Sequence, residues 1–289
     1  VVYWAKSPVP LSIQTTSGQA KSLDFLKHNK REAPDTNSLV VARMLLEVLT
    51  FRSLFRNTQA RIYSGPKLTH ESSKWLWMFA LLFHYSFLIV LIRHMRLFLN
   101  PTPVCLDWLE FFDGIFQIGA PNWYITDICL VAGLLLLLLR RFFMTKVRYI
   151  SLANDYFPLF LLLGIATSGI LMRYLLHGNV DVVAIKQLAV GLVTFHPTIT
   201  APIASIFYIH LFLVCTLLAY FPHSKLMHMA GVLFSPTRNM RNNTRAVRHI
   251  NPWNPDIKPH SYAGYEDEFR EFMVEAGIPV EKELPASEA

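Results

Sequence analysis

The stretch from Trp75 to Phe98 most constrains what this chain can fold into. It is long and apolar enough to cross a bilayer, yet it carries His84 and His94. An α-helix rises about 1.5 Å per residue, so the two imidazoles lie about 15 Å apart along its axis. In a hydrocarbon core about 30 Å thick, one falls toward each side. Because lipid offers an ionisable ring no hydrogen-bond partner, both histidines are predicted to be functional.

The apolar residues gather in blocks, and 53% of the 289 residues are hydrophobic. Complete spans are predicted at about 75–98, 123–143, 156–176 and 203–221. The predicted fold is therefore an all-α integral membrane protein, a helical bundle of four complete spans. Val1 to Trp4 are apolar as well, so the end of an earlier membrane helix is expected there.

Basic residues indicate which loops face the cytoplasm. The net charge is +7, and Lys and Arg concentrate in residues 5–73, 144–155 and 223–289. The loops 99–122 and 177–202 are acidic or nearly uncharged. By the positive-inside rule, the N-terminal segment and the C-terminal tail are predicted to be cytoplasmic in a multi-pass protein of the inner (cytoplasmic) membrane. No nucleic-acid-binding module is recognised, so membrane topology explains the basic surplus.

Three parts follow from this pattern: a basic cytoplasmic segment (1–73), the membrane bundle (74–222), and the end of the last helix with a tail expected to dock a cytoplasmic partner (223–289). In the first part, Ser38 to Phe55 has apolar residues at helical spacing interrupted by charges. An interfacial amphipathic helix and a soluble docking helix fit this pattern equally well. Tyr262 to Glu275 is predicted to form a short amphipathic helix.

The last span repeats the anomaly of the first, with His210 inside it and His228 eighteen residues later. At about 100° per residue the two would share one face of an unbroken helix, although Pro222 is expected to kink or pause it. The first and last spans are predicted to be antiparallel. His84 and His228 would then lie near the cytoplasmic side, and His94 and His210 nearer the outside.

Two histidines at each of two depths are what bis-imidazole ligation of two b-type haems requires. The three cysteines are far apart and form no CxxC motif, which argues against covalent haem or an iron–sulfur cluster in this chain. Arg93, Arg96 and Arg173 are candidates to pair with haem propionates, with interfacial anchoring as the alternative. For the whole chain the alternative is a haem-free membrane anchor or a proton-relay or transport subunit. A di-metal oxygenase is rejected, because no clustered HxxH or HxxxH motif occurs.

The His-x9-His and His-x17-His pairs resemble those of the gamma-subunit family of respiratory nitrate reductases, which are membrane cytochromes b. Stretches such as QIGAPNWYITD, VRYISLANDYFPLFLLLGI and YIHLFLVCTLLAYFPHSKLMHM resemble one branch, the cytochrome b (M) subunits of the Dsr transmembrane complexes of dissimilatory sulfur metabolism. The resemblance covers nearly the whole chain. It implies a five-helix protein whose first helix is truncated here, with haem ligands at His84, His94, His210 and His228.

The resemblance also implies electron exchange between the menaquinone pool and a cytoplasmic heterodisulfide-reductase-like iron–sulfur subunit, in sulfite or sulfate respiration or sulfur oxidation. Further membrane and periplasmic subunits, including a c-type cytochrome, are implied as partners. The chain would be an electron-transfer subunit of a quinol-linked oxidoreductase, and reverse flow would use the same residues. Nitrate reductase relatives place a lysine near the distal haem, but 97–122 has none. Asp113, Gln117 and Lys186 are therefore the candidates for the quinone and its protons, and a solvated acidic face is the alternative for Asp113.

Overall fold

The computed structural model describes residues 25, 27–65, 67–114, 123–176, 180–235, 238–243, 247 and 258–282. Within these ranges the protein is mostly helical. Three helices are long and apolar enough to cross a membrane, at Lys74–Leu97, Ala153–Leu175 and Ser205–His223. Helix α6 (Ile125–Phe143) lies at the other expected span, but any 18 consecutive residues of it include Asp127, Arg140 and Arg141. Each of the other three helices has an apolar stretch of 18 residues with at most two charged residues. The count of four spans therefore stays a prediction.

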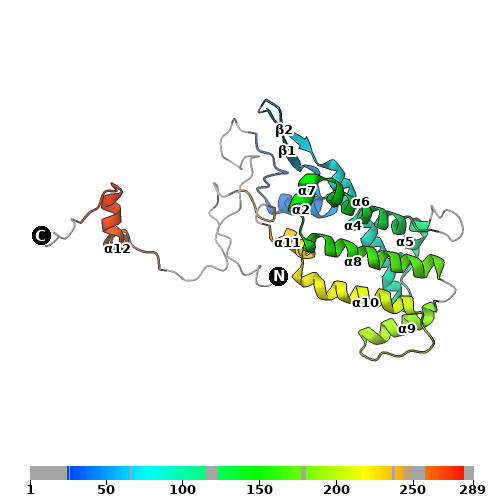
Figure 1. The fold of residues 1–289 in the computed structure, drawn as a ribbon. Coiled ribbons are helices and arrows are strands. Elements are labelled where there is room, and N and C mark those ends of the chain that lie inside the picture. Colours follow the sequence, from blue (N-terminus) through cyan, green and yellow to red (C-terminus); the bar gives the residue numbers. More distant parts are fainter. Residues whose placement is uncertain are drawn as a thin grey trace.

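Four helices form a row in which each packs against the next: α4 (Lys74–His94), α6, α8 (Ala153–Ile170) and α10 (Ser205–Tyr220) (Figure 1). The end of α4 is ion-paired with the start of α6, and the end of α6 contacts the start of α8. The start of α8 in turn contacts the end of α10. Successive helices are therefore antiparallel, and α4 and α10, at the two ends of the row, are antiparallel as well.

The centre of the row is a small apolar core between α6 and α8, formed by Leu130, Leu134, Leu162 and Ala166. Close packing of α6 on α4 depends on Gly133, because a Cβ there would lie only 3.0 Å from the Cα and backbone nitrogen of Phe83. Small residues permit such close approach between membrane helices. The backbone of α6 therefore lies directly against the turn of α4 that precedes His84.

The chain does not continue as one helix beyond α10. Two 3-10 turns, η4 (Phe221–His223) and η5 (Lys225–Met227), flank Ser224, whose backbone is extended (φ −119°, ψ 169°). Helix α11 (His228–Gly231) and the 3-10 turn η6 (Val232–Phe234) follow. The predicted pause at Pro222 is confirmed, because proline cannot donate the backbone hydrogen bond that would continue the helix. The shared face of an unbroken helix therefore does not account for the position of His228.

The segment before α4 contains α2 (Asn37–Thr50) and α3 (Arg52–Phe55), with Phe51 between them in the left-handed region at φ 50°. An antiparallel hairpin follows, formed by β1 (Thr58–Tyr63) and β2 (Lys67–Ser72). This hairpin corrects the all-α prediction. Its strands are almost wholly exposed, and their partly buried residues are the polar Gln59 and Glu71, so neither strand buries an apolar face.

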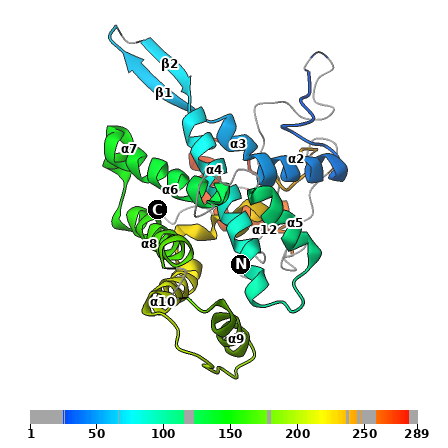
Figure 2. The ribbon, with the colours of Figure 1, turned by 90° about the vertical axis from the view of Figure 1, so that its right-hand side faces the viewer.

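Two further helices occupy segments that were expected to be loops. Helix α5 (Val104–Gly114) packs beside α4, and α9 (Val182–Val193) beside α10, at the same end of the bundle (Figures 1 and 2). The remaining short elements are η1 (Met95–Leu97), α7 (Thr145–Ile150) and a π-helical turn, η2 (Leu171–Leu175). Helix α12 (Tyr262–Glu275) has the bounds that the sequence predicted.

Candidate functional site

The first histidine pair joins α4 to α10, and we name it the outer pair after the side of the membrane that the sequence predicts for it. The ring centroids of His94, the last residue of α4, and His210, in α10, lie 6.4 Å apart, and the rings are nearly parallel at 12°. Gly169 of α8 passes beside them, since a Cβ at that position would lie 3.4 Å from Cε1 of His210. Gly169 therefore packs directly against the imidazole of His210.

The second pair, the inner pair, joins α4 to the segment after the helix break. The centroids of His84 and His228 lie 6.0 Å apart, with the rings nearly perpendicular at 83°. Phe51 and Phe83 present their rings edge-on to His84, at centroid distances of 5.0 and 4.8 Å. The inner pair thus has aromatic neighbours, and it forms because the chain changes direction after α10.

Hydrogen bonds at Nδ1 fix the tautomer of both histidines on α4. His84 Nδ1 lies 2.7 Å from the carbonyl oxygen of Ala80, and His94 Nδ1 lies 2.7 Å from that of Val90. A carbonyl oxygen only accepts, so the proton is on Nδ1 in each ring. The lone pair is therefore on Nε2, which is the atom left for a metal.

In the other two histidines the proton is also on Nδ1, but the hydrogen-bond acceptors differ. His228 Nδ1 donates to the carbonyl of Lys225 at 2.9 Å. His210 Nδ1 lies 2.9 Å from Ser168 Oγ, whose own hydroxyl proton is directed to the carbonyl of Gly164 at 2.7 Å, so the imidazole donates. Among the described residues, no hydrogen bond engages Nε2 of any of the four histidines.

The spacing within each pair matches two imidazoles on one metal ion. A metal–nitrogen bond of about 2 Å, plus about 1.1 Å from that nitrogen to the ring centre, places two centroids roughly 6 Å apart across the ion. The pairs lie at 6.0 and 6.4 Å. Within the described part of the chain, no group of three or more His, Cys, Asp or Glu could hold a metal by itself. Two neutral imidazoles fit the axial positions of a b-type haem, whose porphyrin supplies the other four nitrogens.

The three arginine candidates differ in what they contact. Arg93 is buried: it is ion-paired with Asp113, lies 3.3 Å from a carboxylate oxygen of Asp127, and donates to Thr126 Oγ1 at 3.1 Å. Its guanidinium also lies over the ring of Tyr124, 4.0 Å from the centroid. Arg93 therefore joins α4 to α5 and α6, and these partners would compete with a propionate.

Arg96 and Arg173 are more accessible. Arg96 pairs with Glu110 of α5 at 2.5 Å. Arg173 lies over the rings of Tyr124 and Tyr174, at 4.1 and 5.7 Å, and no ion pair involves it among the described residues. Of the three, Arg173 has the guanidinium that is most available for a carboxylate ligand.

The two quinone candidates that the structure describes, Asp113 and Lys186, have different hydrogen-bond partners. Asp113 is buried, pairs with Arg93, and accepts hydrogen bonds from the backbone and hydroxyl of Thr126 at 3.0 and 2.5 Å. The alternative of a solvated acidic face is therefore wrong for Asp113. Lys186, in α9, donates to the carbonyl of Leu99 at 2.8 Å. Gln117 lies outside the described residues.

Both histidine pairs fall within one region of similarity to known proteins. Residues 44–249 match the family described as the nitrate reductase gamma subunit. This chain belongs to the nitrate reductase gamma subunit family. The match extends from α2 through α4 and α10 to beyond His228, so the family predicted from the histidine spacing is confirmed.

Two relatives are similar to this gamma-subunit family member over most of its length. A protein of Archaeoglobus fulgidus named "Hdr-like menaquinol oxidoreductase cytochrome b-like subunit" is 46% identical over 269 residues, which cover 90% of this chain and 79% of the relative. A protein of the same name from Archaeoglobus profundus is 42% identical over 263 residues, covering 89% of this chain and 77% of the relative.

Two residues of this gamma-subunit chain that hydrogen-bond to the histidines, Ser168 and Lys225, were not predicted from the sequence. Ser168 was not predicted to hold a histidine, although a hydroxyl in the middle of a span can hydrogen-bond to a neighbouring helix. Lys225 holds His228 through its carbonyl, while its ammonium group pairs with Asp155 at the start of α8 at 2.7 Å. Nothing local in the sequence indicates the contact between Lys225 and Asp155, because seventy residues separate them.

Proposed function

We propose that this protein is a membrane cytochrome b that holds two haems by bis-histidine ligation, His94 with His210 and His84 with His228. The observation that carries the proposal is the presence of two imidazole pairs with matched spacing and unbonded Nε2 atoms. When bound, the haems supply one-electron redox chemistry. In this proposal the chain is an electron-transfer subunit of a quinol-linked oxidoreductase.

The chain's own residues hold and orient the ligands. Backbone carbonyls of α4 fix His84 and His94, while Ser168 and Lys225 fix the partner histidines. Such hydrogen bonds to the second ring nitrogen set the tautomer and raise the basicity of the ligand. The arginine we propose as a propionate partner is Arg173, because Arg93 and Arg96 already have carboxylate partners.

We propose menaquinol as the quinone substrate, since both relatives carry menaquinol oxidoreductase in their names. Its site is proposed near the outer pair, where Lys186 and Gln117 remain candidates and where Asp113, paired with Arg93, organises the surrounding helices. At the opposite end, the basic N-terminal segment and the tail are proposed to be cytoplasmic and to contact an Hdr-like iron–sulfur subunit. Other membrane subunits and a periplasmic c-type cytochrome complete the proposed complex, and we propose sulfur metabolism as its context.

The test is a reduced-minus-oxidised visible spectrum with pyridine haemochrome quantitation on the purified chain. Wild type is expected to contain two b haems per chain, and His94→Ala and His228→Ala are each expected to remove about one. Each substitution deletes one of two axial ligands, so loss at one pair should leave the other intact.

His223→Ala is the matched control, because His223 is exposed and lies only five residues before His228. It is expected to retain both haems. A well-folded wild-type chain without haem would overturn the proposal and favour the haem-free anchor or proton relay. Equal haem loss in all three variants would show that the pairing is wrong.

A further inference from the structure

Helix α2 has its polar face turned inward and its apolar face turned outward. Val40, Arg43 and Glu47 form its buried face. The opposite side is apolar and exposed, with Val41, Leu45 and Leu49 at 58, 55 and 54%. A helix on the surface of a soluble domain shows the reverse pattern. The outward face of α2 therefore suits an apolar surrounding.

The charged side chains on the inward face of α2 form hydrogen bonds and ion pairs with other protein groups, so α2 can lie in an apolar surrounding. Glu47 accepts hydrogen bonds from the backbone and hydroxyl of Ser53 at 3.2 and 2.7 Å and pairs with Arg238 at 3.4 Å. Arg43 donates to the carbonyl of Glu32 and lies 3.9 Å from its carboxylate. Buried polar groups are tolerated where such partners exist, so the charges of α2 do not require solvent.

Two hydrogen bonds set the depth of α2 along the spanning helix α4. Trp77 donates to the carbonyl of Thr50 at 2.7 Å, and Tyr85 donates to that of Leu49 at 2.6 Å. These donors belong to the first and fourth turns of α4, about 5 and 17 Å from its start. Side chains on a helix point back toward its N-terminus, so the end of α2 lies within about 10 Å of the end of the span. Interfacial helices bury their apolar face at this depth, roughly 5–10 Å.

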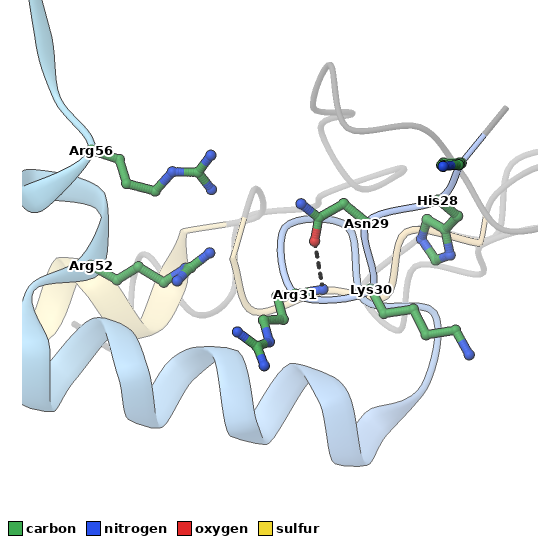
Figure 3. Close-up of a pocket in the computed structure, with 7 residues that line it drawn as sticks. His28, Asn29, Lys30, Arg31, Arg52 and Arg56 are labelled. Atoms are coloured by element: carbon green, nitrogen blue, oxygen red, sulfur yellow. Dashed lines mark hydrogen bonds between the residues drawn. The ribbon is translucent and has the colours of Figure 1, made fainter.

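A basic hollow adjoins the same segment (Figure 3). It has a volume of about 780 Å³, and its lining contains His28, Asn29 and five cationic residues, Lys27, Lys30, Arg31, Arg52 and Arg56. Arg52 and Arg56 extend from α3 and its C-terminal end toward the loop of residues 28–31, as Figure 3 shows.

Positive charge exceeds negative charge in this hollow. Glu32 is the neighbouring carboxylate, and Arg52 and Arg56 both bind it. No ion pair involves Lys27, Lys30 or Arg31 among the described residues. The hollow is therefore suited to an anionic ligand.

We propose that residues 27–56 form a lipid-binding element, in which the outward face of α2 enters the acyl chains and the basic hollow binds the anionic headgroup of a membrane phospholipid. One short segment has an exposed apolar face, lies near the N-terminal end of α4, and carries the excess positive charge of the basic hollow. Basic residues beside a membrane surface attract anionic lipids, and an amphipathic helix adds apolar burial to that attraction. The end of α2 is hydrogen-bonded to α4, which itself exposes apolar residues such as Leu88 and Leu91.

The first experiment measures what surrounds α2. Nitroxide labels are placed at Leu45→Cys, at Leu88→Cys as the lipid reference, and at Glu268→Cys as the water reference, in a chain whose native cysteines are replaced by serine. The full chain, with any subunits that co-purify, is reconstituted in bilayer nanodiscs. Collisions with oxygen and with a water-soluble nickel chelate are then compared by electron paramagnetic resonance.

The label at Leu45 is expected to collide preferentially with oxygen, as the label at Leu88 does. Preference for the nickel chelate, as at Glu268, would place α2 in water and overturn the proposal. Protection from both reagents would mean that protein covers this face, and it would overturn the assignment to lipid equally.

The second experiment tests the headgroup by native mass spectrometry of chains released from nanodiscs that contain anionic and zwitterionic phospholipids. The variant Lys27→Ala/Lys30→Ala/Arg31→Ala is expected to lose bound anionic lipid. The affinity should fall on the order of a hundredfold, since each cation near the surface contributes about a factor of five. The control Lys67→Ala/Lys146→Ala/Arg148→Ala removes the same charge from exposed positions elsewhere and should retain the lipid.

Inorganic phosphate in excess distinguishes the lipid from a free anion. Lipid that stays bound in the presence of phosphate supports the proposal, because acyl chains add to the affinity. Displacement of the lipid by phosphate would identify a site for a free anion. Equal loss of lipid in both triple variants would show that only the total charge of the protein matters. Displacement by phosphate and equal loss in both variants would each overturn the proposal.

Discussion

The outer and inner histidine pairs have nearly the same ring separation but are held in different ways. The outer pair belongs to two regular helices, and its surroundings include the buried charges of Arg93, Asp113 and Asp127. The inner pair depends on the irregular segment after α10, where a carbonyl and one ion pair position His228. The comparison teaches that the outer pair depends on the packing of whole helices and the inner pair on a short local conformation.

The largest effect is expected at the buried charges beside the outer pair. Arg93→Met would leave Asp113 and Asp127 without their cation, and breaking a buried ion pair costs about 3–5 kcal/mol. Thermal unfolding should shift accordingly, with haem lost from the outer pair first. Arg96→Met removes a more exposed pair and should cost less than about 1 kcal/mol. If the two substitutions destabilised the protein equally, the proposal that the outer pair depends on the buried ion pairs of Arg93 would be wrong.

A smaller effect is expected from the hydroxyl that orients the outer pair. Ser168→Ala removes the acceptor for His210 Nδ1, and loss of such a partner typically lowers metal affinity about 10–100-fold. Haem titration should show weaker binding at the outer pair alone, with a higher midpoint potential because the ligand is less basic. Thr167→Ala is the matched control, since its hydroxyl bonds only to the carbonyls of Leu163 and Gly164. An inner site that weakened as much as the outer would contradict the assignment.

The smallest effect is expected at Asp155, whose ion pair with Lys225 helps to position His228 of the inner pair. Asp155→Asn retains an acceptor for the backbone of Leu152 but removes the charge that pairs with Lys225. The ammonium group is largely exposed, so the pair contributes about 1 kcal/mol or less, and haem affinity at the inner pair should fall at most about fivefold. Asp267→Asn, in an exposed ion pair of α12, is the control for lost charge. If Asp155→Asn weakened haem binding at the outer pair and not at the inner pair, the proposal that this ion pair positions His228 would be wrong.

The sequence predicted the long apolar helices, their order and the pairing of the histidines, because these follow from hydrophobic length and from alternation of loop charge. His84 and His94 lie on one regular helix, so their separation could be calculated from the helical rise. The position of His228 followed only in part: Pro222 indicated a break, but the direction of the chain beyond it depends on tertiary contacts such as that between Lys225 and Asp155.

Residues whose roles depend on distant partners could not be assigned from the sequence. Arg93 was a propionate candidate because it adjoins His94, whereas its observed partners come from α5 and α6. Helices α5 and α9 were missed because they have only 11 and 12 residues, too few to cross a bilayer, so their segments were assigned as loops between spans. The hairpin of β1 and β2 was missed because each strand has only six residues, few of them apolar, within a segment that is polar and basic overall.

Gly133 limits how far this family member can vary in sequence at the centre of its bundle. The contact it makes is with the backbone of Phe83, which cannot rotate away as a side chain can. An added methyl group would require α4 or α6 to shift by a few tenths of an ångström. A shift of α4 would carry both His84 and His94, which lie about 15 Å apart along its axis. One hydrogen atom in place of a methyl group therefore affects the alignment of both histidine pairs at once. Alanine is the mildest replacement at most helical positions, yet at Gly133 it would misalign both.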